Sequence, residues 1–169
     1  IAPDIITYGK IIGGGMPVGA YGSSHKIMSL ISPEGKVYQA GTLSGNPVAM
    51  AAGIAQLGEC LKGGFYEDLE KKTFDFTNRL NVFAREKKYS FKVFSIGSIF
   101  WFAFTDKVKI SSAEEIDANS MKLFSLLHHD LLEKGVYLGP SGYEVGFISS
   151  AHNKEILDEA ADKICNSLE

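Results

Sequence analysis

Arginine is scarce in this sequence of 169 residues, in which only Arg79 and Arg85 occur. Lysine supplies the rest of the positive charge, and the net charge of -3 argues against a surface that binds nucleic acid. Glycine or charged residues interrupt the longest apolar runs, so no segment is predicted to span a membrane. A hydrophobic content of 45% is sufficient for a globular protein with a core.

Cysteine and histidine are also few, and their spacing predicts no metal site. The two cysteines, Cys60 and Cys165, lie on separate predicted helices and are expected to be free, mostly buried thiols in a reducing compartment. The four histidines show neither the His-x-x-x-His spacing nor the carboxylate pairing typical of metal ligands. We therefore expect no bound metal ion.

Glycine, in contrast, is abundant around one lysine near the start of the chain. Lys10 follows residues 1–7, which are predicted to form a buried strand, and precedes Gly13, Gly14 and Gly15. Glycines permit positive φ angles and let a ligand approach the backbone closely. A desolvated lysine can lose its proton and form a Schiff base with an aldehyde. From these residues alone, a catalytic lysine and an exposed lysine beside an ordinary glycine turn both remain open.

A second glycine-rich segment, residues 38–47, ends at a predicted helix start. Asn46 can cap the helix with its side chain, and Pro47 suits the first helical position. The helix that follows is apolar on nearly all sides and is predicted to be buried. The hydroxyls of Thr42 and Ser44 precede it, where backbone amides suit an anion such as phosphate. The alternative is that both hydroxyls only satisfy the local backbone.

The rest of the chain predicts a long helix followed by strands and helices in alternation. Residues 65–88 have the periodicity of a helix with one apolar face. We therefore divide the chain into the end of a first domain at 1–63, a linking helix at 64–90 and an α+β domain at 91–169. Further predicted strands lie at 17–23, 91–95, 99–104, 136–138 and 145–148, and further helices at 25–31, 111–134 and 154–168.

Two segments resemble the cofactor-lysine region of class III aminotransferases: residues 9–22 (GKIIGGGMPVGAYG) and residues 38–47 (YQAGTLSGNP). The likeness continues through Gly97, Ser98, Thr105 and residues 135–147, so it covers most of the chain. It implies the α/β fold of fold-type I pyridoxal-phosphate-dependent transferases. This chain would supply the end of their large α/β domain and their small α+β C-terminal domain, with a longer protein preceding residue 1.

The resemblance also implies roles for individual residues. Lys10 is implied to form the Schiff base with pyridoxal 5'-phosphate and to act as a general acid and base. Thr42 is implied to contact the phosphate of the cofactor, which passes through its pyridoxamine 5'-phosphate form. Because the family's threonine at this position reaches the phosphate held by the partner subunit, a homodimer with shared sites is implied.

Glu144 narrows the activity that the resemblance implies. Relatives that use glutamate or 2-oxoglutarate carry an arginine in the C-terminal domain that grips the α-carboxylate. Here Arg79 and Arg85 both lie on the predicted helix at 65–88, and Glu144 stands at the matching place. A glutamate would repel a dicarboxylate and favour the amino groups of a small-molecule substrate. The resemblance is thus nearest to members that move an amino group within one substrate molecule in tetrapyrrole biosynthesis. Without the family, Glu144 could be an edge-strand carboxylate facing water.

Two alternatives stay open for the function. The protein could be an ω-aminotransferase that acts on another amino donor, or a non-catalytic fragment that dimerises or holds a partner. Trp101 is bulkier than the family pattern leads us to expect, and Gly142 with Tyr143 varies the usual pair, so the substrate fit is open as well. The resemblance implies a cytoplasmic location, or the plastid in a plant or alga.

Overall fold

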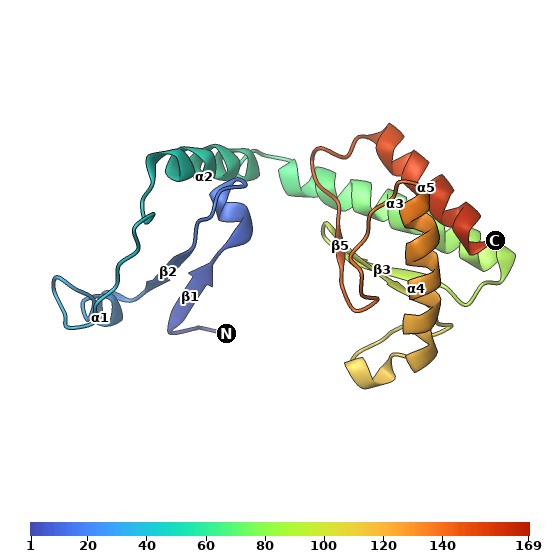
Figure 1. Cartoon of the computed structure of the whole chain (residues 1–169), viewed down its shortest axis with the longest axis horizontal. Coiled ribbons are helices and arrows are strands. Elements are labelled where there is room, and N and C mark those ends of the chain that lie inside the picture. Colours follow the sequence, from blue (N-terminus) through green and yellow to red (C-terminus); the bar gives the residue numbers. More distant parts are fainter. The chain divides into compact units, whose positions relative to one another are not determined.

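The computed structural model describes all 169 residues, and the chain divides after Phe65 into two units, Ile1–Phe65 and Tyr66–Glu169. Figure 1 labels the elements of each unit. In chain order they are β1 (Ile5–Tyr8), the 3-10 helix η1 (Lys10–Gly13), β2 (Ala20–Ser23), α1 (His25–Met28), α2 (Pro47–Cys60), α3 (Phe65–Lys87), β3 (Lys92–Ile96), β4 (Ile99–Ala103), the 3-10 helix η2 (Ala113–Glu115), α4 (Ala118–Glu133), β5 (Gly146–Phe147) and α5 (Lys154–Leu168).

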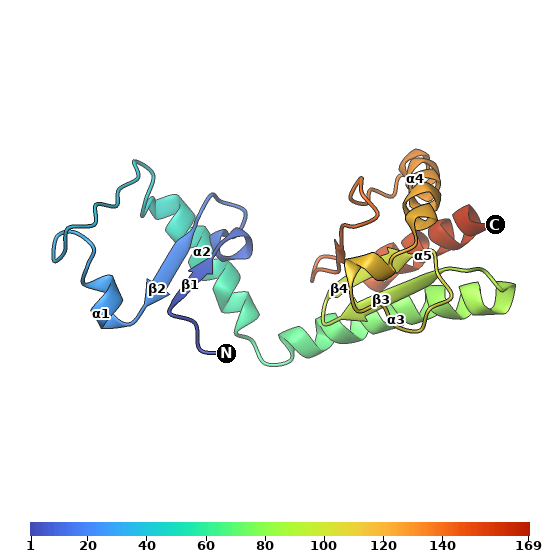
Figure 2. The ribbon, with the colours of Figure 1, turned by 90° about the horizontal axis from the view of Figure 1, so that it is seen from below.

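The first unit is built on an antiparallel pair of strands. β1 and β2 pair in register from Ile5 opposite Ser23 to Tyr8 opposite Ala20. The chain between them carries η1, and α2 packs alongside η1 (Figures 1 and 2). The two strands and the helix after Asn46 follow the sequence prediction, because glycines separate the strands and a capping residue starts the helix.

Burial in the first unit differs from the prediction. All four residues of β1 are exposed, although a buried strand was expected. α2 was expected to be buried on all sides, but only Ala49 and Gly53 are buried. The reason is geometric: two strands and one long helix can bury only the faces that they turn toward one another. α1 also ends at Met28 rather than at residue 31, and Ser24 occupies the N-cap position without a capping hydrogen bond from its side chain.

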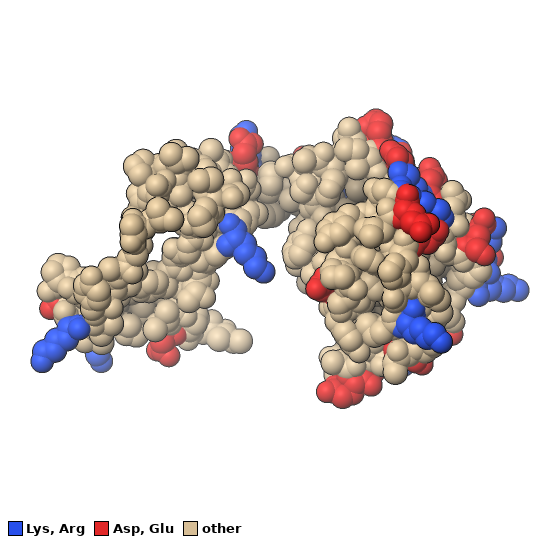
Figure 3. Space-filling model, in the orientation of Figure 1, with Lys and Arg blue, Asp and Glu red and all other residues tan.

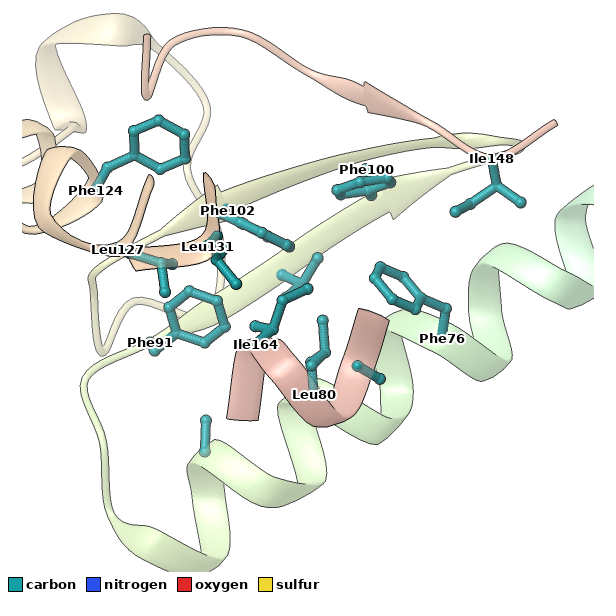
Figure 4. Close-up of a cluster of buried hydrophobic side chains, with 13 residues drawn as sticks. Phe76, Leu80, Phe91, Phe100, Phe102, Phe124, Leu127, Leu131, Ile148 and Ile164 are labelled. Atoms are coloured by element: carbon teal, nitrogen blue, oxygen red, sulfur yellow. The ribbon is translucent and has the colours of Figure 1, made fainter. Parts of the chain in front are cut away.

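The second unit is a three-stranded antiparallel sheet packed against three helices. The strand order is β3-β4-β5, and Gly97 and Ser98 form the turn between the first two strands. α3 runs along the hairpin of β3 and β4 (Figure 2). Side chains from the sheet and from α3, α4 and α5 meet in one core (Figure 4): Phe76, Leu80, Phe91, Phe100, Phe102, Phe124, Leu127, Leu131, Ile148 and Ile164.

Two predictions for the second unit were wrong in detail. The helix expected from residue 111 begins at Ala118, because the Asp117 carboxylate caps it by accepting a hydrogen bond of 2.8 Å from the Asn119 amide. The expected strand at 136–138 joins no sheet. The Val136 amide instead donates to the carbonyl of Leu131, at 2.8 Å, so this segment follows the end of α4. The predicted helices at 65–88 and 154–168 and the hairpin are confirmed.

Candidate functional site

Lys10 occupies an unusual backbone conformation two residues after the end of β1. Its φ angle is +53°, in the left-handed region that few residues other than glycine adopt. Such a conformation costs about 1–3 kcal/mol and persists only where the surroundings impose it, which happens often at functional sites. Lys10 is exposed, and none of the eight ion pairs of the chain includes it. Its amine is therefore available to a ligand.

Close contact with α2 holds the backbone that follows Lys10. A Cβ atom at Gly14, whose φ is +56°, would collide with the carbonyl of Ala52 on α2. Reciprocally, a Cβ atom at Gly53 would collide with the carbonyl of Ile12. Glycine at both places lets the backbone that follows Lys10 lie directly against the helix. The lysine thus stands at the start of a segment that is held rather than free.

The loop before α2 presents the hydroxyl of Thr42 to solvent. The Ser44 amide donates to the Gly41 carbonyl at 2.9 Å, which closes a turn around Thr42. Neither the hydroxyl nor the amide of Thr42 has a hydrogen-bond partner within the chain. Residues 41 and 43–45 line a small hollow of about 250 Å³ beside it. Thr42 can therefore donate two hydrogen bonds to an anion.

The first amides of α2 are not available in the same way. The side-chain oxygen of Asn46 accepts hydrogen bonds from the amides of Val48, at 3.0 Å, and Ala49, at 3.2 Å. This confirms the predicted cap, and it leaves the amides before the helix, not the first amides within it, for an anion. A phosphate in this unit would meet the Thr42 loop instead. Because the segments of Lys10 and Thr42 both adjoin α2, the structure brings these two predicted residues onto one unit.

Glu144 belongs to the second unit, on the loop that leads into β5. Its amide donates to the carbonyl of Ser141 at 3.0 Å, and its exposed carboxylate lies against Gly139. Together with His152, it is a polar residue in the lining of a mostly apolar cavity of about 380 Å³. Glu144 therefore sits on a turn rather than within the ladder of an edge strand.

The two arginines remain on α3, as the sequence indicated. Arg79 bonds to two aspartates of α5: its Nη1 lies 3.2 Å from an oxygen of Asp158, and its Nη2 contacts Asp162. Arg85 is exposed in the last turn of α3. Arg79 is thus engaged in holding α3 and α5 together, and no arginine lies near Glu144 on its loop.

Sequence reasoning did not find one contact near this site. The indole nitrogen of Trp101, on β4, donates a hydrogen bond of 2.7 Å to the carbonyl of Gly142. Both residues were noted separately in the sequence, the large side chain at 101 and the glycine at 142. Because they lie far apart in the sequence, no local pattern indicates that they are in contact.

Other titratable groups do not form a second site. Both cysteines are free and half-buried, rather than mostly buried as predicted, and burial raises the pKa of the Cys165 thiol. No cluster of three or more histidine, cysteine, aspartate or glutamate side chains could hold a metal ion. No helix is both long enough and apolar enough to cross a membrane.

Comparison with known proteins gives a family match over the whole chain. Residues 1–169 match the family model described as aminotransferase class-III. A curated relative from Legionella pneumophila (strain Paris), a glutamate-1-semialdehyde 2,1-aminomutase, is 47% identical over 171 residues, which are 99% of this chain and 40% of the relative. The chain therefore spans about 40% of the length of the curated relatives it matches.

Solved structures give the same fold. An omega-transaminase from Sphaerobacter thermophilus superposes with a TM-score of 0.83 at 25% identity, over 99% of this chain and 39% of that protein. A transaminase with PLP bound superposes with a TM-score of 0.78 at 28% identity, over 99% of this chain and 38% of that protein. The predicted α/β class, fold-type I, is confirmed.

Proposed function

Because this chain belongs to the class III aminotransferase family, we propose that it is part of a pyridoxal-phosphate-dependent aminomutase that converts glutamate-1-semialdehyde to 5-aminolevulinate. The reaction moves an amino group between two carbons of one molecule and provides a precursor of tetrapyrroles. We further propose a cytoplasmic location, or the plastid in a plant or alga.

The identity of 47% to the Legionella aminomutase supports this proposal most strongly. It extends over 99% of the chain, whereas the two transaminase structures described above are 25% and 28% identical. The absence of an arginine beside Glu144 supports it as well, because relatives that exchange amino groups with glutamate or 2-oxoglutarate use an arginine at this place to grip the α-carboxylate.

The first unit has groups that fit pyridoxal 5'-phosphate. Lys10 offers an exposed amine that no carboxylate occupies, and Thr42 offers a hydroxyl and an amide without partners. When bound, the cofactor supplies an aldehyde for an amine and a ring that withdraws electrons from the reacting carbon. We propose that the Lys10 Nζ binds the aldehyde carbon and that Thr42 donates hydrogen bonds to the phosphate.

Lys10 would have a second role whenever its amine is free. Its free Nζ can take a proton from one carbon and return it to another, because a neutral amine is a base and the resulting ammonium an acid. The contact between η1 and α2 restricts the backbone around Lys10, so the amine moves mainly through its own side-chain torsions. One group would thereby serve both halves of the transfer.

We propose that Glu144 selects the substrate by charge. Its carboxylate can accept hydrogen bonds from the substrate's amino groups and would repel a free dicarboxylic keto acid. Glu144→Arg should therefore increase amino exchange with added 2-oxoglutarate about tenfold or more, since it replaces a repulsion by a bidentate attraction. Glu144→Gln is the matched control, and exchange that stays at the wild-type rate in Glu144→Arg would remove this role.

We also propose a homodimer in which Thr42 contacts the cofactor held by the partner subunit. A mixing experiment with the full-length protein tests this arrangement. Lys10→Ala and Thr42→Val each damage one component of a site. In mixed dimers, one of the two sites is intact if Thr42 acts across the interface, and activity returns after subunit exchange. If Thr42 acts within its own subunit, every site carries one defect and mixing restores nothing.

The decisive experiment supplies full-length protein with glutamate-1-semialdehyde and no keto acid, and follows 5-aminolevulinate. Sustained turnover supports the aminomutase, because amino groups are recovered within each cycle. A transaminase stops once the amino groups on its cofactor are spent. Formation of product only after a keto acid is added would refute the proposal.

The second candidate is an ω-aminotransferase that uses another amino donor. The TM-score of 0.83 to the Sphaerobacter omega-transaminase favours it among the alternatives. It predicts turnover that requires both an amine and a keto acid, so the same experiment separates the two candidates.

A further inference from the structure

The loop that carries Glu144, residues 139–145, has few anchors. It belongs to no strand, and β5, which follows it, pairs with β4 through only two residues, Gly146 and Phe147. Behind the loop lies the cavity of about 380 Å³, lined on its other sides by side chains of β4, α4 and α5. Because an open volume adjoins the loop, core packing alone does not fix the position of Glu144.

Trp101 supplies one of the anchors, in the middle of this loop. Its indole N–H donates to the Gly142 carbonyl at 2.7 Å, and Gly142 is itself buried. The indole ring is in turn stacked on Phe94, with ring centroids 5.7 Å apart and planes inclined by 24°. A short hydrogen bond to a buried carbonyl, from a ring held by a neighbouring strand, restrains the loop strongly.

The opposite side of Gly142 is packed against α4. A Cβ atom at this position would lie 2.8 Å from the sulfur of Met121 and 3.0 Å from the ring of Phe124. Gly142 is therefore held between the indole of Trp101 and the surface of α4. The backbone then turns through the bond from the Glu144 amide to the Ser141 carbonyl, at 3.0 Å.

On the basis of the function proposed above, we propose that Trp101 is a positioning residue that fixes the Glu144 carboxylate by holding the carbonyl of Gly142, and thereby favours the substrate's amino groups over dicarboxylic keto acids. Trp101 acts through the loop and does not itself touch the substrate. The preference for amines depends on the place of the carboxylate as well as on its charge, since hydrogen bonds weaken steeply when their geometry is lost.

Hydrogen exchange tests the structural half of this proposal in the full-length protein. Trp101→Phe keeps an aromatic ring on Phe94 but removes the N–H. Exchange at the amide of Glu144 should accelerate about three- to tenfold, in line with the loss of one hydrogen bond. Tyr143→Phe is the matched control, because it removes a hydroxyl from the same loop that makes no hydrogen bond within the chain. The Val136 amide, bonded to Leu131 before the loop, should keep its wild-type rate in both variants.

A double-variant cycle tests the functional half. Trp101→Phe should raise KM for the semialdehyde about three- to tenfold while kcat changes less than twofold, and should increase exchange with added keto acid. In a Glu144→Gln background, Trp101→Phe should have no further effect on either quantity. Equal effects of Trp101→Phe in both backgrounds, or unchanged exchange at the Glu144 amide, would overturn the proposal.

Failure of the proposed function gives a different result. A wild-type protein that turns over only with an added keto acid is an intermolecular transaminase, and the cycle is then run with its amino donor. Coupling between positions 101 and 144 is still required in that case, and its absence refutes the role of Trp101. Coupling in a transaminase would uphold the positioning role and refute only the aminomutase.

Discussion

The two units of this chain differ in how much of their apolar surface they bury. In the second unit, Leu80 and Leu131 are 0% exposed within a core shared by the sheet and three helices. In the first unit, Ile54 and Leu61 on and just after α2 are 73% and 86% exposed. Charge follows the same division, since seven of the eight ion pairs lie in the second unit and only Lys62–Glu59 in the first. Figure 3 shows few charged side chains on the first unit and many on the second.

This difference shows how stability and chemistry are distributed. The second unit has what an independent domain needs, and its loop presents Glu144 from a complete core. The first unit carries Lys10 and Thr42 on segments that little else covers. An exposed apolar surface of this extent is typical of an interface. Within these residues the first unit therefore lacks the layer of cover that the second unit has.

The largest expected effect comes from the first unit. Lys10→Ala in the full-length protein should reduce turnover by about three orders of magnitude or more, because it removes the group that we propose as both nucleophile and proton carrier. Lys26→Ala, which changes an exposed lysine of the same unit, should remain near the wild-type rate. Borohydride should attach the cofactor covalently to the wild type and not to Lys10→Ala. Comparable turnover in both variants, or no labelling of the wild type, would favour a non-catalytic module.

The free energy of unfolding, unlike turnover, should depend mainly on the second unit. In the 169-residue chain, Leu80→Ala should lower the free energy of unfolding by about 3 kcal/mol, since it leaves a cavity in a closed core. Leu61→Ala makes the same chemical change at an exposed position and should cost less than about 0.5 kcal/mol. Urea unfolding followed by circular dichroism measures both. Similar losses at the two sites would mean that the first unit buries Leu61 in solution, and the contrast between the units would disappear.

Local sequence signals predicted the positions of helices and strands better than they predicted which of these elements are buried. Alternating aromatic and β-branched residues predicted the β3–β4 hairpin, and a side-chain cap followed by proline predicted α2, because both signals act within a few residues. The burial of α2 could not be predicted in this way. An apolar helix indicates that something covers it, but not whether that surface lies in the same segment of chain. The start of α4 was misplaced because Ser111 and Asp117 are both competent caps.

In the candidate site, too, local sequence predicted some features and not others. Glycines around Lys10 indicated an irregular backbone, and the structure gives it a positive φ, which no local pattern specifies for a lysine. The Trp101–Gly142 hydrogen bond joins residues 41 positions apart and required the fold to be seen. The roles of Lys10, Thr42 and Glu144 stay predictions until the variants above are measured.

Helix caps offer a smaller, matched test of the two units. Asn46 caps α2 in the first unit, and Asn153 caps α5 in the second by accepting a hydrogen bond of 2.9 Å from the Ile156 amide. Asn153→Ala should lower the free energy of unfolding of the 169-residue chain by about 1 kcal/mol. Asn46→Ala should reduce helix content at 25 °C without moving the main urea transition, because α2 contributes little to the core that unfolds. Equal shifts of the transition would show that the two units unfold together.

The smallest expected effect concerns the ion pairs that distinguish the second unit. A hydrogen bond from the Lys154 ammonium, aided by the charge of Arg79, holds the pKa of the Asp158 carboxyl below its ordinary value of 3.8. A carboxyl whose pKa is lower in the folded than in the unfolded state stabilises the fold at pH values above its unfolded-state pKa. This stabilisation is lost as the pH falls through the folded-state pKa. Between pH 6 and pH 2.5, the urea midpoint should therefore fall slightly less in Asp158→Asn than in the wild type. Glu34→Gln changes an exposed carboxylate of the first unit that forms no ion pair. Its urea midpoint should fall by as much as that of the wild type. If the urea midpoint of Asp158→Asn falls by as much as that of the wild type, solvent screens these pairs completely. The charged surface of the second unit then adds nothing to its stability.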